Sequence, residues 1–448
     1  MKCGSTGLAA LIIVVSSMLV AERAQALDSN MNISGAQEFI TLLSEQKYRE
    51  ATAGFDSTMK AAMSPEKLAE TWQMLQSQAG LFKRQMGTRT EESGGYEIVI
   101  VTSEFENAAI DIKVVYNTEG RISGLWFAPA QAATQYESPS YVNAKVFRKT
   151  EVTVGEGDWA LPGTLTVPWG DKPAPVVVLV HGSGPNDRNE SIGPNKVFRD
   201  LAEGLSSNGI AVLRYDKRTL THRNKIMAIA ESLTVKEETI DDALAAVDLL
   251  RKTRGIDTSR IFVLGHSLGG TLIPRIAKED PSIAGLIIMA GMARPLEDVV
   301  VEQVTYILSL NGTISPAEQQ QLDSLKAQVA LVKSQSLSKS TPADQLPLGL
   351  PASYWLDLRG YEPARMAVSL TQPLLILQGE RDYQVTKDDF QTWKNELAKR
   401  SNVEFKLYPK LNHLFIEGEG KITPDEYNAS GHVAESVIKD ITEWIMGQ

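Results

Sequence analysis

A serine flanked by glycines is the most informative chemical feature of the sequence. Residues 265–270 read Gly-His-Ser-Leu-Gly-Gly, with Ser267 between glycines two positions before and two positions after it. The apolar run 261–264 predicts a buried strand before this serine, and a helix is expected from Leu268 on. A tight strand–turn–helix exposes the hydroxyl, and the free N–H groups of the helix start can bind an oxyanion. The pattern indicates a nucleophile; the alternative is a simple turn.

A serine hydroxyl needs a base, and the chain has five histidines from which to choose. Four stand in less suitable places: His181 in a glycine-rich loop, His222 in a basic loop, His266 beside the nucleophile but expected to point elsewhere, and His432 on the last helix. His413 follows the last predicted strand, at the carboxyl edge of the sheet where open α/β sheets place their sites. His413 is therefore the predicted base.

A carboxylate must orient the imidazole and stabilise its charged form. Residues 379–382 read Gly-Glu-Arg-Asp and directly follow the predicted strand 373–378. Asp382 is the predicted acid and Glu380 the alternative. An ordinary surface aspartate beside Arg381 is the remaining interpretation.

A second glycine-rich loop indicates where an oxyanion would bind. Residues 181–185 read His-Gly-Ser-Gly-Pro and follow the apolar run 176–180. The backbone N–H of Ser183, or of Gly184 as the alternative, would form an oxyanion hole with the N–H of Leu268. Each such donor contributes roughly 3–4 kcal/mol to stabilising a transition state.

The elements that position these residues alternate between strand and helix. Strands are predicted at 173–180, 210–215, 260–264, 284–290, 373–378 and 403–408, and helices at 198–207, 235–253, 268–278 and 386–400. This alternation predicts an α/β fold, with a mostly parallel sheet covered by helices on both faces, over residues 141–448.

One interval interrupts the alternation and predicts a helical cap. Residues 293–370 contain helical patterns at 295–310 and 316–334 but no convincing strand. Long insertions of this kind are usually lids or binding elements. Tyr354 and Trp355 near the end of the interval are expected to line the substrate pocket.

The part before residue 141 has a different organisation. Helical signals near Ser34 and Pro65 precede alternating stretches at 96–102, 108–116 and 122–127. They predict a small α+β domain over residues 27–128, followed by a linker at 129–140.

The first 26 residues are typical of a secretory signal. Lys2 supplies the positive start, residues 8–21 an apolar stretch and residues 24–26 an Ala-Gln-Ala cleavage site. A retained anchor is the alternative, although the stretch is shorter than the roughly 20 residues of a spanning helix. Export to the periplasm or the medium, without membrane insertion after cleavage, is the expectation. The single cysteine, Cys3, lies inside the signal.

Composition limits the possible partners. A net charge of −10 argues against nucleic acid as a ligand. The sequence has neither metal-ligand spacing nor a phosphate-binding loop, so no metal and no cofactor are expected. The basic residues between Lys217 and Lys225 are interpreted as a solvated loop, or alternatively as an attraction for a carboxylate substrate.

Residues 141–448 resemble an α/β-hydrolase of the bacterial carboxylesterase type. Three motifs carry the resemblance: His-Gly-Ser-Gly-Pro-Asn-Asp-Arg at 181–188, Arg-Tyr-Asp-Lys-Arg at 214–218, and Gly-His-Ser-Leu-Gly at 265–269. The chain order Ser, Asp, His also matches that fold. The N-terminal domain resembles the cone-shaped fold of nuclear transport factor two. The resemblance implies hydrolysis of carboxylic esters through an acyl-enzyme without a cofactor, with a serine peptidase or amidase and a non-catalytic binding protein as alternatives.

Overall fold

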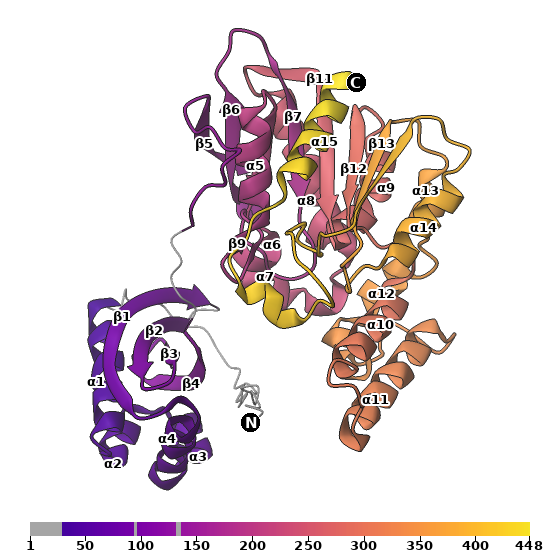
Figure 1. Ribbon diagram of the computed structural model, residues 1–448. Coiled ribbons are helices and arrows are strands. Elements are labelled where there is room, and N and C mark those ends of the chain that lie inside the picture. Colours follow the sequence, from indigo (N-terminus) through magenta and orange to yellow (C-terminus); the bar gives the residue numbers. More distant parts are fainter. Residues whose placement is uncertain (1–28, 94–95, 131–135) are drawn as a thin grey trace. The chain divides into compact units, whose positions relative to one another are not determined.

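The structure is a computed structural model that describes residues 29–93, 96–130 and 136–448. The chain divides into two compact units, the first ending at Ala133 and the second spanning Thr134–Gln448 (Figure 1). The expected signal, at residues 1–26, lies outside the described residues. Within the described ranges, no helix combines the length and the apolar character that crossing a membrane requires.

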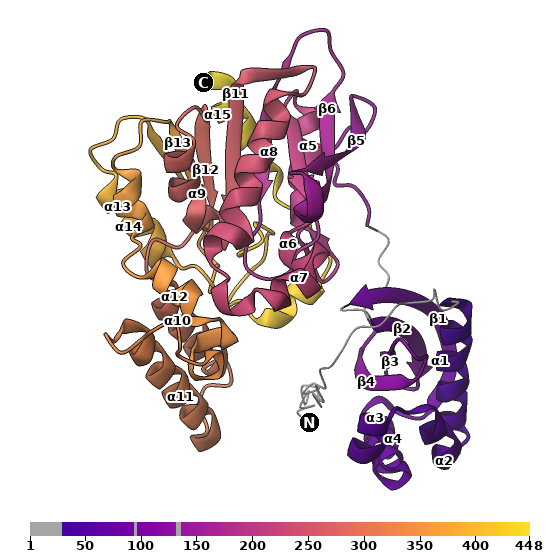
Figure 2. The same ribbon diagram turned by 180° about the vertical axis from the view of Figure 1, so that it is seen from behind.

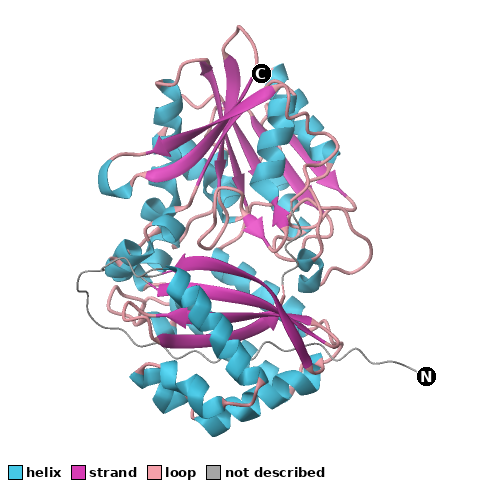
Figure 3. Cartoon of the chain, turned by 90° about the vertical axis from the view of Figure 1, so that its left-hand side faces the viewer, coloured by secondary structure: helices cyan, strands magenta, loops and turns pink. Residues whose placement is uncertain are grey.

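The first unit packs helices against an antiparallel sheet (Figure 3). Its elements are α1 (Ser29–Ser44), α2 (Tyr48–Ala51), α3 (Ser57–Ala62), α4 (Pro65–Ala79) and, in sheet order, β1 (Phe82–Ser93), β2 (Tyr96–Phe105), β3 (Ala109–Tyr116) and β4 (Ile122–Pro129). Trp72 of α4 packs against Phe82 and Phe105 of the sheet. The predicted small α+β domain is confirmed. The sequence did not indicate β1, because charged and polar residues dominate this strand.

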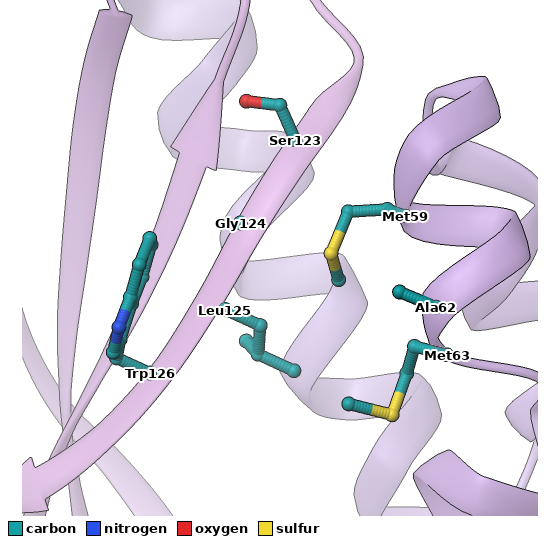
Figure 4. Close-up of a pocket in the computed structure, with 7 residues that line it drawn as sticks. All are labelled: Met59, Ala62, Met63, Ser123, Gly124, Leu125 and Trp126. Carbon is teal, nitrogen blue, oxygen red and sulfur yellow. The ribbon is translucent and has the colours of Figure 1, made fainter. Parts of the chain in front are cut away.

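A small hollow in the first unit lies between α3 and β4 (Figure 4). Methionine and alanine side chains of α3 face residues 123–126 of β4 across it. A Cβ at Gly124 would displace the Trp126 ring. Most of the residues that line the hollow are apolar.

The second unit is built on an eight-stranded sheet. In sheet order its strands are β14 (Val403–Tyr408), β13 (Leu374–Gly379), β12 (Gly285–Met289), β11 (Ile256–His266), β7 (Ala174–Val180), β10 (Ala211–Tyr215), β6 (Leu161–Pro168) and β5 (Phe147–Val154). The first six run parallel, and β6 and β5 continue the sheet antiparallel. This confirms the predicted mostly parallel sheet. Strands β5 and β6, at one edge of the sheet, were not predicted from the sequence.

Helices cover both faces of this sheet (Figures 1 and 2). They are α5 (Val197–Ser207) and α15 (Glu435–Gly447) on one face, and α8 (Asp241–Arg251), α9 (Leu268–Glu279) and α14 (Lys387–Glu396) on the other. Alternate residues of β7 enter the two cores: Val176 and Val178 pack on the α8 side, Val177 and Leu179 on the α5 side. A strand buried on both faces in this way has a continuous apolar sequence.

The predicted cap is confirmed as a helical insertion between β12 and β13. It contains α10 (Leu296–Leu308), α11 (Pro316–Lys333) and α12 (Ala352–Leu358), and α13 (Pro363–Ala367) leads back to the sheet. Ser315 and Glu318 form a capping box at the start of α11. Two further short helices, α6 (Arg218–Thr221) and α7 (Arg223–Ala228), follow β10, and β8 (Ser191–Ile192) pairs with β9 (Asn195–Lys196).

Candidate active site

Ser267 lies at a strained turn between β11 and α9. Its φ of 54° and ψ of −120° are rare for a residue other than glycine, and such a conformation costs on the order of 1–3 kcal/mol. The turn requires glycine on both sides: a Cβ at Gly265 would collide with the Gly269 backbone, and a Cβ at Gly269 would collide with the Val180 carbonyl. The backbone N–H of Ser267 donates to the Met289 carbonyl at 2.9 Å, which ties the turn to β12.

His413 and Asp382 form a buried pair. Nδ1 of His413 lies 2.7 Å from Oδ2 of Asp382. The other carboxylate oxygen, Oδ1, accepts the backbone N–H groups of Gln384 and Val385 at 2.8 and 3.0 Å, so the carboxylate is held from both sides. Glu380, the alternative acid, is exposed to solvent. With Nδ1 donating to the carboxylate, Nε2 of His413 is the nitrogen left to accept a proton.

Ser267 and His413 meet at a cavity of about 270 Å³. The lining comes from the loops after β7, β11, β12, β13 and β14 and from the cap: Gly182, Ser183, Asn186, Glu190, Ile192, His266, Ser267, Met292, Leu296, Val300, Gln303, Leu348, Gln384 and His413. These loops follow the carboxyl ends of parallel strands, the edge where open α/β sheets bind ligands. Most of the cap's contribution is apolar.

The predicted oxyanion loop lies against Ser267. A Cβ on Gly182 would be only 3.1 Å from the Cβ of Ser267, so the backbone of this loop passes close to the serine. Ser183 lines the cavity, and the side-chain amide of Asn186 donates to its carbonyl at 3.0 Å. Leu268 begins α9, and the first N–H groups of a helix have no partner within it. Leu268 thus follows Ser267 directly, and Ser183 follows the glycine that lies against the Ser267 side chain.

Two of the five histidines, His266 and His413, line the cavity. His181 is buried beneath the loop, with Nε2 at 2.5 Å from the Tyr215 carbonyl, and burial lowers its pKa. His222 lies 2.9 Å from the Ala160 carbonyl, and His432 lies beside Asp200. The expectation that His266 points away from the site was wrong.

His266 forms a second buried pair, with Glu190. Its Nδ1 lies 2.9 Å from Oε2 of Glu190, and its Nε2 lies 2.9 Å from the His413 carbonyl. Burial disfavours the charged form of both groups, but their mutual attraction outweighs it, so the pKa of His266 is raised and that of Glu190 is lowered. An imidazole between a carboxylate and a carbonyl can donate to both only when both nitrogens carry protons. No sequence pattern indicated a role for Glu190, which carries a positive φ of 48°.

The structure places Tyr354 and Trp355 inside the cap and outside the cavity lining, contrary to the prediction. They are 2% and 0% exposed. The Tyr354 hydroxyl donates to Oε2 of Glu238 at 2.7 Å, and Trp355 packs in an apolar cluster of the cap. The apolar positions that do line the cavity from the cap are Leu296, Val300 and Leu348.

The basic residues after β10 are held by partners in the protein. Lys217 pairs with Glu238 and Arg218 with Asp242. Lys225 donates to the Asp158 carbonyl. These cations are thus engaged within the fold, which leaves less reason to assign them to a carboxylate substrate.

Comparison with known proteins places the chain among hydrolases. A family model described as serine aminopeptidase, S33, matches residues 171–419, and a model described as a protein of unknown function matches residues 36–125. The chain is 42% identical over 410 residues to esterase EstD of Thermotoga maritima, covering 91% of this chain and 94% of that protein.

The matches among solved structures have low sequence identity. Est1E from Butyrivibrio proteoclasticus is 16% identical, with a TM-score of 0.44, over 66% of this chain and 99% of that one. The acylaminoacyl peptidase of Pyrococcus horikoshii is 14% identical, with a TM-score of 0.44, over 81% and 56%. Because the serine aminopeptidase model covers more than half of the chain and the Thermotoga relative nearly all of it, this chain belongs to that serine hydrolase family of the α/β-hydrolase superfamily.

Proposed function

We propose that this chain hydrolyses carboxylic esters, with Ser267 as nucleophile, His413 as general base and Asp382 as the acid that orients it. The observation that carries the proposal is the strained serine at the start of α9, in the same cavity as a buried His–Asp pair. The extensive identity to a protein named an esterase supports ester substrates.

The proposed reaction has two halves. Nε2 of His413 takes the proton of Ser267 as Oγ bonds to the carbonyl carbon, and the N–H groups of Ser183 and Leu268 bind the resulting oxyanion. The carbon–oxygen bond to the alcohol then breaks, and the alcohol leaves with the proton from His413. A water molecule gives its proton to His413, attacks the acyl carbon and releases the acid, and Ser267 regains its proton.

Peptide hydrolysis is the second candidate, because the family description names an aminopeptidase. Binding a free α-amino group calls for a carboxylate in the site. Among the residues that line the cavity, Glu190 is the sole acid, and both its oxygens are engaged by Gly182 and His266. The lining therefore favours an uncharged ester. A non-catalytic binding protein, the third alternative, would not react with a fluorophosphonate probe.

We also propose that the protein is exported, with cleavage after Ala26. The proposal rests on the charged start, the apolar stretch at 8–21 and the Ala-Gln-Ala site. Expression in a bacterium followed by sequencing of the mature N-terminus tests it: Leu27 should be the first residue, and the protein should be found in the periplasm or the medium. An intact N-terminus in the cytosol would contradict export.

Replacement of the nucleophile is the first test of the reaction. Ser267→Ala should lower hydrolysis of p-nitrophenyl acetate by at least about 10⁴-fold, because removal of a triad nucleophile abolishes covalent catalysis. The thermal midpoint should not fall, because alanine keeps the Cβ and loses only a hydroxyl that faces the cavity. Activity within tenfold of the unmodified enzyme would refute the triad.

The acid is tested by two matched amides. Asp382→Asn should lower kcat by about 10⁴-fold, as the equivalent change does in chymotrypsin-type enzymes, because the amide favours the wrong imidazole tautomer. Glu380→Gln is the control, since Glu380 is exposed and its replacement should lower kcat less than about twofold. A larger loss of kcat from Glu380→Gln than from Asp382→Asn would show that Glu380, and not Asp382, orients His413.

The residues that set chain-length preference are tested in the cap. Leu348 lines the cavity and is 62% exposed. Leu348→Ala should therefore change the ratio of kcat/KM between butyrate and acetate esters, by about fourfold for each substrate methylene that packs on the leucine. Trp355→Ala should instead lower stability by about 3–5 kcal/mol, because the ring is fully buried. Thermal midpoints and ester profiles of both variants check this. If Trp355→Ala alone changed the butyrate-to-acetate ratio, Trp355 and not Leu348 would be the residue that lines the acyl pocket.

A further inference from the structure

Lys217 is a buried lysine beside the oxyanion loop. Its side chain is 2% exposed. Nζ donates to the Gly182 carbonyl at 2.8 Å and to Oε1 of Glu238 at 2.6 Å. Lysine is almost never fully buried unless it is paired, and here one of its two partners is a main-chain atom of the catalytic loop.

The carbonyl that Lys217 contacts belongs to the same peptide group as the Ser183 N–H. No cis peptide occurs in the described part of the chain, and a trans peptide is planar, so its N–H points opposite to its C=O. Fixing the Gly182 oxygen therefore fixes the direction of the Ser183 N–H. A cation on the oxygen also draws electron density toward it, and a polarised peptide is a stronger donor.

The preceding peptide group is held as well. The Gly182 N–H donates to Oε1 of Glu190 at 2.7 Å, and Glu190 pairs with His266 next to the nucleophile. Asn186 adds a weaker contact, from its side-chain amide to the Gly182 carbonyl at 3.3 Å. Gly182, which has no side chain of its own to restrict rotation, is thus held at both its N–H and its C=O by buried ionisable side chains.

We propose that Lys217 is a positioning residue that orients and polarises the Gly182–Ser183 peptide as an oxyanion donor. The proposal rests on the proposed function. It concerns how well the site stabilises the transition state and not how tightly it binds the substrate. Glu238 holds the ammonium in place, and Tyr354 of the cap donates to the other oxygen of Glu238 at 2.7 Å. The cap is therefore connected to the oxyanion loop through two side chains.

The test replaces the buried pair with neutral residues. Lys217→Met together with Glu238→Gln removes the ammonium without leaving an unpaired carboxylate, which would itself destabilise the fold. We expect kcat for p-nitrophenyl acetate to fall about 10- to 100-fold with KM within about threefold, less than the loss of an entire donor. Lys217→Met with Glu238→Leu is the second version should the first fail to fold.

The matched control is the neighbouring pair Arg218–Asp242, which is also largely buried. Within the described part of the chain, neither of its side chains donates to the Gly182 carbonyl. Arg218→Met with Asp242→Asn should leave kcat within about twofold, at a similar change in thermal midpoint. The inhibition constant of a trifluoromethyl ketone, whose adduct carries an oxyanion, should rise with the Lys217 variants in proportion to the loss of kcat/KM.

Three outcomes would overturn the inference: kcat within about threefold of the unmodified enzyme in a folded Lys217 variant, an equal loss in the Arg218 control, or an unchanged inhibition constant. Each can be told apart from failure of the proposed function, which Ser267→Ala tests separately. A dead Ser267 variant beside a fully active Lys217 variant would retain the triad and reject only the positioning role.

Discussion

The close approach of two backbones, at the turn after β11 and at the end of β7, is the constraint on which the rest of the site depends. Gly269 lies against the Val180 and His181 carbonyls, and Gly182 lies against Ser267. A Cβ at Gly269 would collide with the Val180 carbonyl, and a Cβ at Gly182 would press against the Cβ of Ser267 at 3.1 Å. This approach brings Ser267 and the loop after β7 together, because the position of the turn after β11 also determines where β7 must end. Strain at Ser267 is the cost, which the buried strands on either side offset.

Two pairs of oppositely charged side chains are buried beside the cavity: Glu190 with His266 and Lys217 with Glu238. An isolated buried charge would be expensive and would act on His413 across a short distance, whereas a pair has a much weaker field. The His266 and His413 rings are 4.7 Å apart between centroids. Because each charge is paired, these side chains can hold the backbone without leaving an uncompensated charge beside the cavity.

The sequence allowed prediction of those parts that depend on local order. Ser267 directly follows β11, and Asp382 and His413 lie in the loops that begin after Gly379 and Tyr408, so an apolar run and the residues after it were enough to place all three at one edge. Interactions made across the fold were not predictable: nothing in the neighbourhood of Glu190 indicates that it pairs with His266. The prediction that Trp355 lines the pocket was wrong, because an apolar side chain can line a cavity or pack in a core. The periodicity of the sequence does not distinguish these two places. Strand β5 was not predicted, because most of its side chains are exposed and its sequence lacks an apolar run.

The cap lies between β12 and β13 in the sequence. During synthesis it therefore separates Ser267 from Asp382 and His413. A ribosome delivers the strands around Ser267 first, then the cap, and only afterwards Asp382 and His413. In the proposed mechanism, a growing chain thus carries Ser267 for the whole synthesis of the cap before the proposed base, His413, is made. Asp382 and His413 can reach the site only when β13 and β14, the last strands to be made, add to the sheet edge. The same mechanism implies that a chain is inactive while it is incomplete, whether synthesis is paused or the chain is cut short.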